Sequence, residues 1–171
     1  RCTMAKTLFL FLFSSRPDPY INAMAYAFDR MAIGAVKLIY IKGVTTGLSD
    51  SQAVITANQI WNRLQDLTDL GDSYHRMNER VLDRQLDALT HAAPAQDLGK
   101  QVKLAGGNAN CILDLTGAAK APSIDIFAVC LALGVNSVYV FELYQKIDPT
   151  ALEKSLYHML EPAAYSYRCL S

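Results

Sequence analysis

Short apolar runs alternate with segments of helical periodicity along most of this chain, and this alternation restricts the possible fold more than any other feature. Continuous apolar runs are typical of strands that are buried on both faces of a sheet. Such runs predict strands at residues 7–13, 36–41, 111–115 and 137–143. Residues 73–81 have a weaker pattern, which we interpret as a further strand.

The segments between these runs carry apolar residues at helical spacing. They predict helices at residues 20–33, 51–67, 98–105 and 122–133, one around Leu82, Leu86, Leu89 and Ala93, and a last one after Asp148 and Pro149. Asp18 is expected to cap the first helix, Pro19 to be its first residue and Gly34 to end it. Alternating strands and helices of this kind form right-handed crossovers. The predicted fold class is therefore α/β, with a Rossmann-like, mostly parallel sheet flanked by helices on both faces.

Composition and charge favour one globular domain with a local ligand site. With 171 residues, 51% of them hydrophobic and 19% charged, a single domain is the default. We interpret residues 1–6 as a tag or linker remnant and residues 7–171 as the domain. Sixteen basic residues balance sixteen acidic ones, so no global field draws the chain to duplex nucleic acid. The four cysteines lack C-x-x-C spacing, which indicates free thiols and a cytoplasmic domain, whose full-length protein could still be membrane-anchored.

A polar loop, SSRPDPYIN, follows the first predicted strand. In parallel sheets, ligands bind at the carboxyl ends of strands, where this loop is expected to lie. It supplies the hydroxyls of Ser14 and Ser15, the guanidinium of Arg16 and the amide of Asn22. The helix N-terminus behind the loop is expected to present free N–H groups to an anion. An ordinary capped loop with an exposed arginine explains the same residues equally well.

A second loop, DLTGAAK, follows the strand predicted at residues 111–115. Thr116 offers a hydroxyl, Gly117 permits a close approach of the backbone, and Lys120 places a positive charge before the next helix. Ala118 and Ala119 leave room above the turn. These residues suit phosphate or ribose, although the bare pattern is a common one. Thr45 and Thr46 follow the second strand at the same sheet edge, where they either contact an adenine or belong to a solvated loop.

Several established fingerprints are missing from the sequence. It contains no G-x-G-x-x-G for dinucleotides, and Lys120 is followed by Ala121, so TGAAK is not an ATPase P-loop. It also contains no G-x-S-x-G elbow of an α/β-hydrolase. The three histidines do not form a metal-binding motif. We therefore assign no catalytic residue, no metal site and no cofactor.

Together, the two loops resemble those of the CARF family, the CRISPR-associated Rossmann-fold sensor domains. The first element is LFLFSSRPDPYIN, and the second, DLTGAAK, is similar to the family motif D-x-T-G-G-T-K. Asp114, Thr116, Gly117 and Lys120 are retained, whereas the two alanines between them stand where the family often has Gly and Thr. That departure removes one hydroxyl and puts hydroxyl-assisted chemistry there in doubt. The resemblance extends in order and topology over almost the whole chain.

The resemblance implies a homodimer that binds a cyclic oligoadenylate, the second messenger of type III CRISPR systems in antiviral defence, across its two-fold axis. It also implies control of a covalently attached effector that is not part of this chain. Tetra-adenylate is favoured over hexa-adenylate. By this resemblance the ligand-binding residues are Ser14, Ser15, Arg16, Asn22, Thr45, Thr46, Thr116, Gly117, Ala118, Ala119 and Lys120. The alternatives are a metal-independent ring nuclease that cleaves the messenger and a flavodoxin-like mononucleotide-binding domain.

Overall fold

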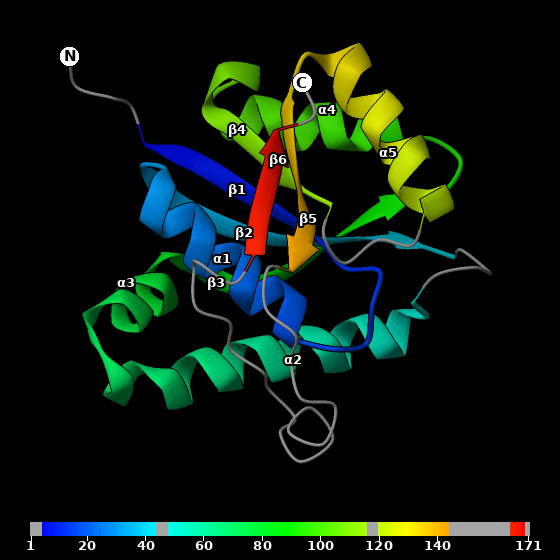
Figure 1. Ribbon diagram of the computed structural model, residues 1–171. Coiled ribbons are helices and arrows are strands. Elements are labelled where there is room, and N and C mark those ends of the chain that lie inside the picture. The colour runs from blue at the N-terminus through cyan, green and yellow to red at the C-terminus, as the bar shows by residue number, and fades with distance from the viewer. Residues whose placement is uncertain (1–4, 44–47, 116–119, 144–164, 170–171) are drawn as a thin grey trace.

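A computed structural model describes the backbone of residues 5–43, 48–115, 120–143 and 165–169 (Figure 1). Six strands form one sheet in the order β3-β2-β1-β4-β5-β6. The parallel strands are β1 (Lys6–Phe11), β2 (Ile33–Lys42), β3 (Val81–Thr90), β4 (Cys111–Asp114) and β5 (Asn136–Leu143), and β6 (Tyr165–Cys169) runs antiparallel to β5. This is the strand order of the doubly wound Rossmann fold, not that of flavodoxin. The flavodoxin-like alternative is therefore wrong in its topology.

Helices cover both faces of the sheet, which confirms the predicted fold class (Figure 1). The helices are α1 (Asp18–Arg30), α2 (Asp50–Leu67), α3 (Asp72–Arg80), α4 (Pro94–Leu104) and α5 (Lys120–Leu133), with short 3₁₀ turns η1 (Thr68–Leu70) and η2 (Asn108–Asn110). Alternate residues of β1 point to opposite faces. Leu8 and Leu10 pack with α1, α2 and α3, whereas Phe9 and Phe11 pack with α4 and α5. Both layers are thus held by the same central strand.

The structure contradicts the sequence-based prediction between α2 and α4. Residues 73–81, predicted as a strand, lie in helix α3 and the first residue of β3, and the leucine-containing segment predicted as a helix is the edge strand β3. Val81 pairs with Val36, and Leu86 pairs with Leu38. Residues 82–85 of β3 therefore lie opposite one residue of β2 and bulge out of the ladder. A bulge interrupts the two-residue period that identifies a strand. Leu82, Leu86 and Leu89 therefore imitate helical spacing.

Smaller differences concern the ends of elements. β1 begins at Lys6, within the segment interpreted as a tag or linker. α1 ends at Arg30, and Gly34 lies in β2 instead of ending the helix. A Cβ at Gly34 would stand 2.7 Å from the Cβ of Ala5, so the close approach of the chain excludes a side chain there.

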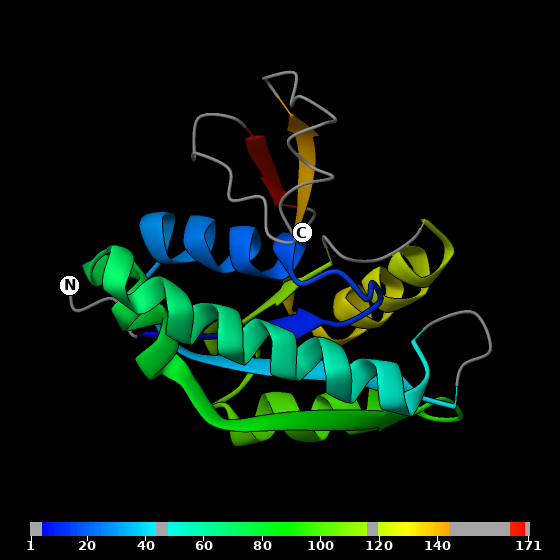
Figure 2. The ribbon, with the colours of Figure 1, turned by 90° about the horizontal axis from the view of Figure 1, so that it is seen from below.

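The second edge of the sheet was not predicted. β6 was not expected, and the predicted last helix lies outside the described residues. In Figure 2 the β5–β6 pair turns steeply away from strands β1 to β3, as the accumulated twist of a sheet allows.

Two cysteines, one on β4 and one on α5, lie in the core on the side of the sheet covered by α4 and α5. Cys111 and Cys130 are free and buried, as the sequence indicates, and burial raises the pKa of both thiols, that of Cys130 to about 12. Such thiols are unreactive and behave as small apolar groups. Within the described ranges, no helix combines the length and apolar character that a membrane crossing requires.

Candidate binding site at the β1/β4 edge

The strand order reverses between β1 and β4, and this reversal creates the candidate site. The two strands are direct parallel neighbours, with Leu10 opposite Asp114, so their carboxyl ends lie at the same edge of the sheet. From there β1 connects to α1 on one face, whereas β4 leads to α5 on the other. In folds of this type, ligands bind where the connections diverge in this way. The structure thus brings together the strands that precede both predicted loops.

The β1–α1 loop, residues 12–17, is held from inside by Tyr20. The Tyr20 hydroxyl accepts hydrogen bonds from the backbone N–H groups of Phe13 (2.9 Å) and Ser14 (2.8 Å) and donates one to the Ser14 carbonyl (3.2 Å). Its side chain is fully buried. Sequence reasoning missed this residue, because its position at the start of a helix does not distinguish it from an apolar core residue.

Burial raises the pKa of Tyr20 to about 12. The hydrogen bonds from Ser14 and Phe13 oppose this effect of desolvation, whereas the charge of Asp114 adds to it. Asp114 itself is 1% exposed at the end of β4. Tyr20, which holds the first loop, and Asp114, the first residue of the second motif, therefore interact electrostatically.

The outer part of the β1–α1 loop exposes Ser15 and Arg16. Ser14 is only partly exposed, and its Oγ accepts a hydrogen bond from the Arg16 N–H at 3.2 Å. The backbone donors of Phe13, Ser14 and Arg16 are therefore all used inside the loop. A ligand at this loop therefore meets mainly side chains, because these three backbone donors are not free.

The start of α1 differs from the expectation of a capped, anion-binding helix terminus. The N-cap is Pro17 instead of Asp18, and no side chain caps the helix. Pro17 and Pro19 have no N–H, and the N–H groups of Tyr20 and Ile21 both donate to the Pro17 carbonyl. Because an anion site of this type needs free first-turn donors, this helix terminus offers fewer of them than the sequence led us to expect.

Asn22, the remaining residue predicted from the first loop, is 7% exposed. It is therefore largely buried on α1, whereas Arg16 is exposed. The other predicted residues lie outside the described parts: Thr45, Thr46, Thr116, Gly117, Ala118, Ala119 and the side chain of Lys120. The structure shows only that α5 begins at Lys120 and that β2 ends at Lys42.

The two strands on the other side of β1 also end in polar contacts at this edge. Tyr40, 8% exposed near the end of β2, has a raised pKa because it is buried and because it bonds to the Asp50 carboxylate at the start of α2. Ser49 and Gln52 form a capping box at the same helix start. These contacts fix the start of α2.

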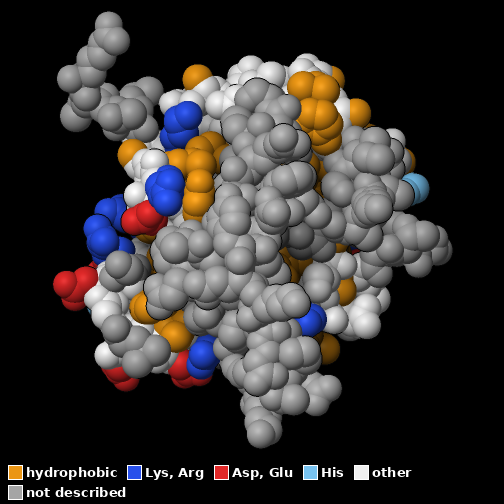
Figure 3. All heavy atoms as spheres, in the orientation of Figure 1, with side chains coloured by type: hydrophobic (Ala, Val, Ile, Leu, Met, Phe, Trp, Pro, Cys, Tyr) orange, Lys and Arg blue, Asp and Glu red, His pale blue; other side chains and the backbone are white. Residues whose placement is uncertain are grey.

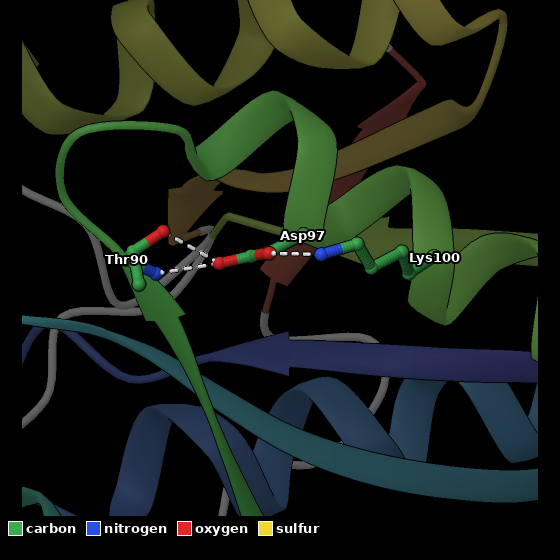
Figure 4. A network of polar contacts seen from close by, with 3 residues as sticks. All are labelled: Thr90, Asp97 and Lys100. Carbon is green, nitrogen blue, oxygen red and sulfur yellow. Dashed lines mark hydrogen bonds and ion pairs between the residues drawn. The ribbon is translucent and has the colours of Figure 1, made fainter.

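At the end of β3, Asp97 closes the connection to α4 (Figure 4). Its Oδ2 accepts from the Thr90 N–H at 3.0 Å and from the Thr90 hydroxyl at 2.6 Å, while Oδ1 bonds to Lys100 Nζ at 3.1 Å. The two bonds from Thr90, followed by that from Lys100, lower the pKa of Asp97 to about 2. Neither Tyr40 nor Asp97 was singled out from the sequence.

The charge on the surface of the protein is of mixed sign. Charged side chains of both signs are interspersed on the surface over α1 and α3 (Figure 3), in agreement with a net charge of zero. Among the described residues, no group of three or more His, Cys, Asp or Glu side chains gathers in the way that a metal ion needs.

The comparisons with known proteins point to a solved structure and not to a sequence family. No protein-family model and no curated protein sequence matches the chain. Among solved structures, the chain is similar to Enterococcus italicus Csm6 bound to cyclic hexa-2'-fluoro-hexa-dAMP, with a TM-score of 0.47 and 13% identity over 90% of this chain. The chain spans 38% of that Csm6 chain. The functional conclusion therefore rests on the residues of this chain.

Proposed function

We propose that this chain is a CARF-type sensor domain that binds a cyclic oligoadenylate, with tetra-adenylate favoured over hexa-adenylate. The single observation that carries the proposal is the pairing of β1 with β4, because it places the strands before SSRPDP and DLTGAAK side by side where the strand order reverses. Either motif alone is a weak signal. Two motifs of one family at adjacent strand ends form a composite site.

The chemistry of the ligand fits the exposed part of the β1–α1 loop. A cyclic oligoadenylate alternates phosphates with riboses and adenines. Arg16 supplies a planar guanidinium that can pair with two phosphate oxygens, and Ser15 supplies a hydroxyl for phosphate or ribose. Because α1 offers no row of free N–H groups, this loop must recognise charge through Arg16. Lys120, at the start of α5, is proposed as the second cation.

We further propose that the ligand lies across a homodimer and controls an attached effector in antiviral defence. A two-fold ring and a two-fold dimer are geometrically compatible, since each protomer contributes the same residues to half of the ligand. The free buried thiols Cys111 and Cys130 support a cytoplasmic location. Binding without cleavage is expected, because Ala119 stands where the family often carries a threonine hydroxyl.

Isothermal titration calorimetry with cyclic tetra-adenylate and cyclic hexa-adenylate tests this function. We expect saturable binding of one ring per two chains, with tetra-adenylate bound more tightly, and no binding of linear tetra-adenylate under the same conditions. Sedimentation at the same protein concentration reports the dimer. No heat with either ring at concentrations where the protein is dimeric would overturn the proposal.

A chromatographic assay of the ring after incubation with the protein separates a sensor from a nuclease. Intact ring is expected for the sensor. Linear products that appear with the wild type and not with Lys120→Ala would establish the ring nuclease instead. The Lys120→Ala variant is also expected to weaken ring binding, because it removes a charge-assisted contact.

A further inference from the structure

We infer that Tyr20 is the positioning residue that holds the β1–α1 loop in its binding geometry before any ligand arrives. This inference rests on the proposed function, which assigns ligand contacts to Ser15 and Arg16. Tyr20 itself lies below the loop, fully buried on α1. It therefore acts on the ligand through the loop and not by direct contact.

The hydrogen-bonding capacity of Tyr20 excludes it as a ligand contact. A phenol has one O–H to donate and two lone pairs to accept with. In the structure its hydrogen goes to the Ser14 carbonyl, and its oxygen accepts from the N–H groups of Phe13 and Ser14. All three capacities are used by two adjacent residues of the loop.

The same three bonds determine how the loop can present its outer residues. With the N–H groups of Phe13 and Ser14 directed inward, the backbone is constrained immediately before Ser15. The Ser14 Oγ then accepts from the Arg16 N–H at 3.2 Å, which constrains the next step of the chain. Pro17 follows, buried and with a restricted backbone. The position of the Arg16 backbone is thus specified from both sides.

A loop ordered in advance binds more tightly because less conformational entropy is lost on binding. Loss of the Tyr20 hydroxyl leaves the aromatic ring in the core but frees the donors of two loop residues. The Tyr20→Phe variant is therefore expected to lower ring affinity by about tenfold, roughly the effect of losing one ordering hydrogen bond. Tyr74→Phe is the matched control, since Tyr74 is a partly buried tyrosine on α3 that packs against the same core.

Amide hydrogen exchange measured by NMR on the ligand-free protein tests the inference without reference to any ligand. In the wild type, the amides of Phe13 and Ser14 should exchange slowly, like those of β1, whereas the amide of Ser15 should exchange rapidly. In Tyr20→Phe the first two should become fast while the β1 amides stay protected. Fast exchange of the Phe13 and Ser14 amides in the wild type would overturn the inference. This part of the test uses the wild-type protein alone, so it does not depend on whether a variant folds.

Calorimetry with cyclic tetra-adenylate completes the test and separates the two proposals. Weaker binding by Tyr20→Phe, with a less favourable entropy and unchanged binding by Tyr74→Phe, supports the positioning role. Equal affinity of Tyr20→Phe and wild type would overturn that role and leave the sensor function intact. Absence of binding by the wild type would overturn the sensor function and, with it, the role of Tyr20 in ligand binding.

Discussion

The β1–α1 and β3–α4 connections leave the same edge of the sheet and are closed in a similar way, but with different chemistry. In each, a side chain from the following helix accepts the N–H at or just beyond the end of the strand: Tyr20 accepts from Phe13 and Ser14, and Asp97 accepts from Thr90. Tyr20 is neutral and fully buried, whereas Asp97 is charged and partly exposed. The β1–α1 connection, called the central loop below, is therefore closed by a neutral group, whereas the β3–α4 connection, called the edge loop below, is closed by a charged one.

The positions of the two connections in the sheet explain this difference. β1 lies beside β4 at the reversal of strand order, whereas β3 is an edge strand. At the edge, a carboxylate with an adjacent lysine closes the connection at little desolvation cost, because water still reaches both groups. At the centre, a buried carboxylate in the place of Tyr20 would lie close to Asp114, which already raises the pKa of Tyr20. A hydroxyl avoids this repulsion.

The largest expected effect distinguishes the two loops by function. Arg16→Ala should reduce affinity for cyclic tetra-adenylate by roughly tenfold to a hundredfold, because a charge-assisted contact contributes about 1.5–3 kcal/mol. Lys100→Ala removes the same charge at the β3–α4 connection, and we expect it to leave affinity unchanged. Titration calorimetry at fixed salt measures both. Equal losses in the two variants would mean that the loops share the ligand and that the comparison fails.

A second experiment uses alkaline pH to measure what Tyr20, which holds the central loop, contributes to the free energy of unfolding. The pKa of Tyr20 is raised to about 12 from 10.0, so its contribution to stability is complete below pH 10 and declines as pH rises towards 12. A shift of this size corresponds to about 2–3 kcal/mol of unfolding free energy across that interval. Urea unfolding at increasing pH should show this decline in the wild type and in Tyr74→Phe. The Tyr20→Phe variant should show a shallower decline, because Cys130 and Tyr40, whose pKa values are also raised, still contribute to it. An unchanged alkaline slope would contradict the assignment.

The smallest expected effect isolates the edge loop at acid pH. The pKa of Asp97 is lowered from 3.8 to about 2, so its contribution is complete above pH 4 and is lost as pH falls through 2. Asp97→Asn should therefore flatten the acid limb of stability without changing the alkaline one. Asp66→Asn, the same change at an exposed position of α2, is the control. If Asp97→Asn also weakens ring binding at neutral pH, the edge connection is part of the site.

Sequence patterns predicted most elements because they report local burial. The runs around Leu8 to Phe11, Val36 to Ile41 and Cys111 to Leu113 are apolar on both faces, as strands between two helical layers must be. β3 was not predicted, because an edge strand is partly exposed and because its bulge at residues 82–85 breaks the strand period. The α3 segment was misjudged because only Met77 and Tyr74 mark its inner face, too few positions to define a period.

The candidate site could likewise be predicted only in part from the sequence. The exposed Ser15 and Arg16 could be selected from their chemistry and from their place after a strand. The number of free donors at the start of α1 could not be predicted, because the use of the Tyr20 N–H by the Pro17 carbonyl depends on where the helix starts. Tyr20 was missed because a tyrosine at the start of an amphipathic helix is, by pattern alone, another apolar core residue.

The sequence by itself determined the layered α/β class and the two polar loops, because both follow from the period and identity of neighbouring residues. Only the tertiary structure decided that β1 lies between β2 and β4, since strand order depends on contacts between segments far apart in the chain. It also decided which way the backbone N–H groups of Phe13 and Ser14 point. Those N–H groups turn inward because Tyr20, seven and six residues further along the chain, brings a hydroxyl to them from the buried side.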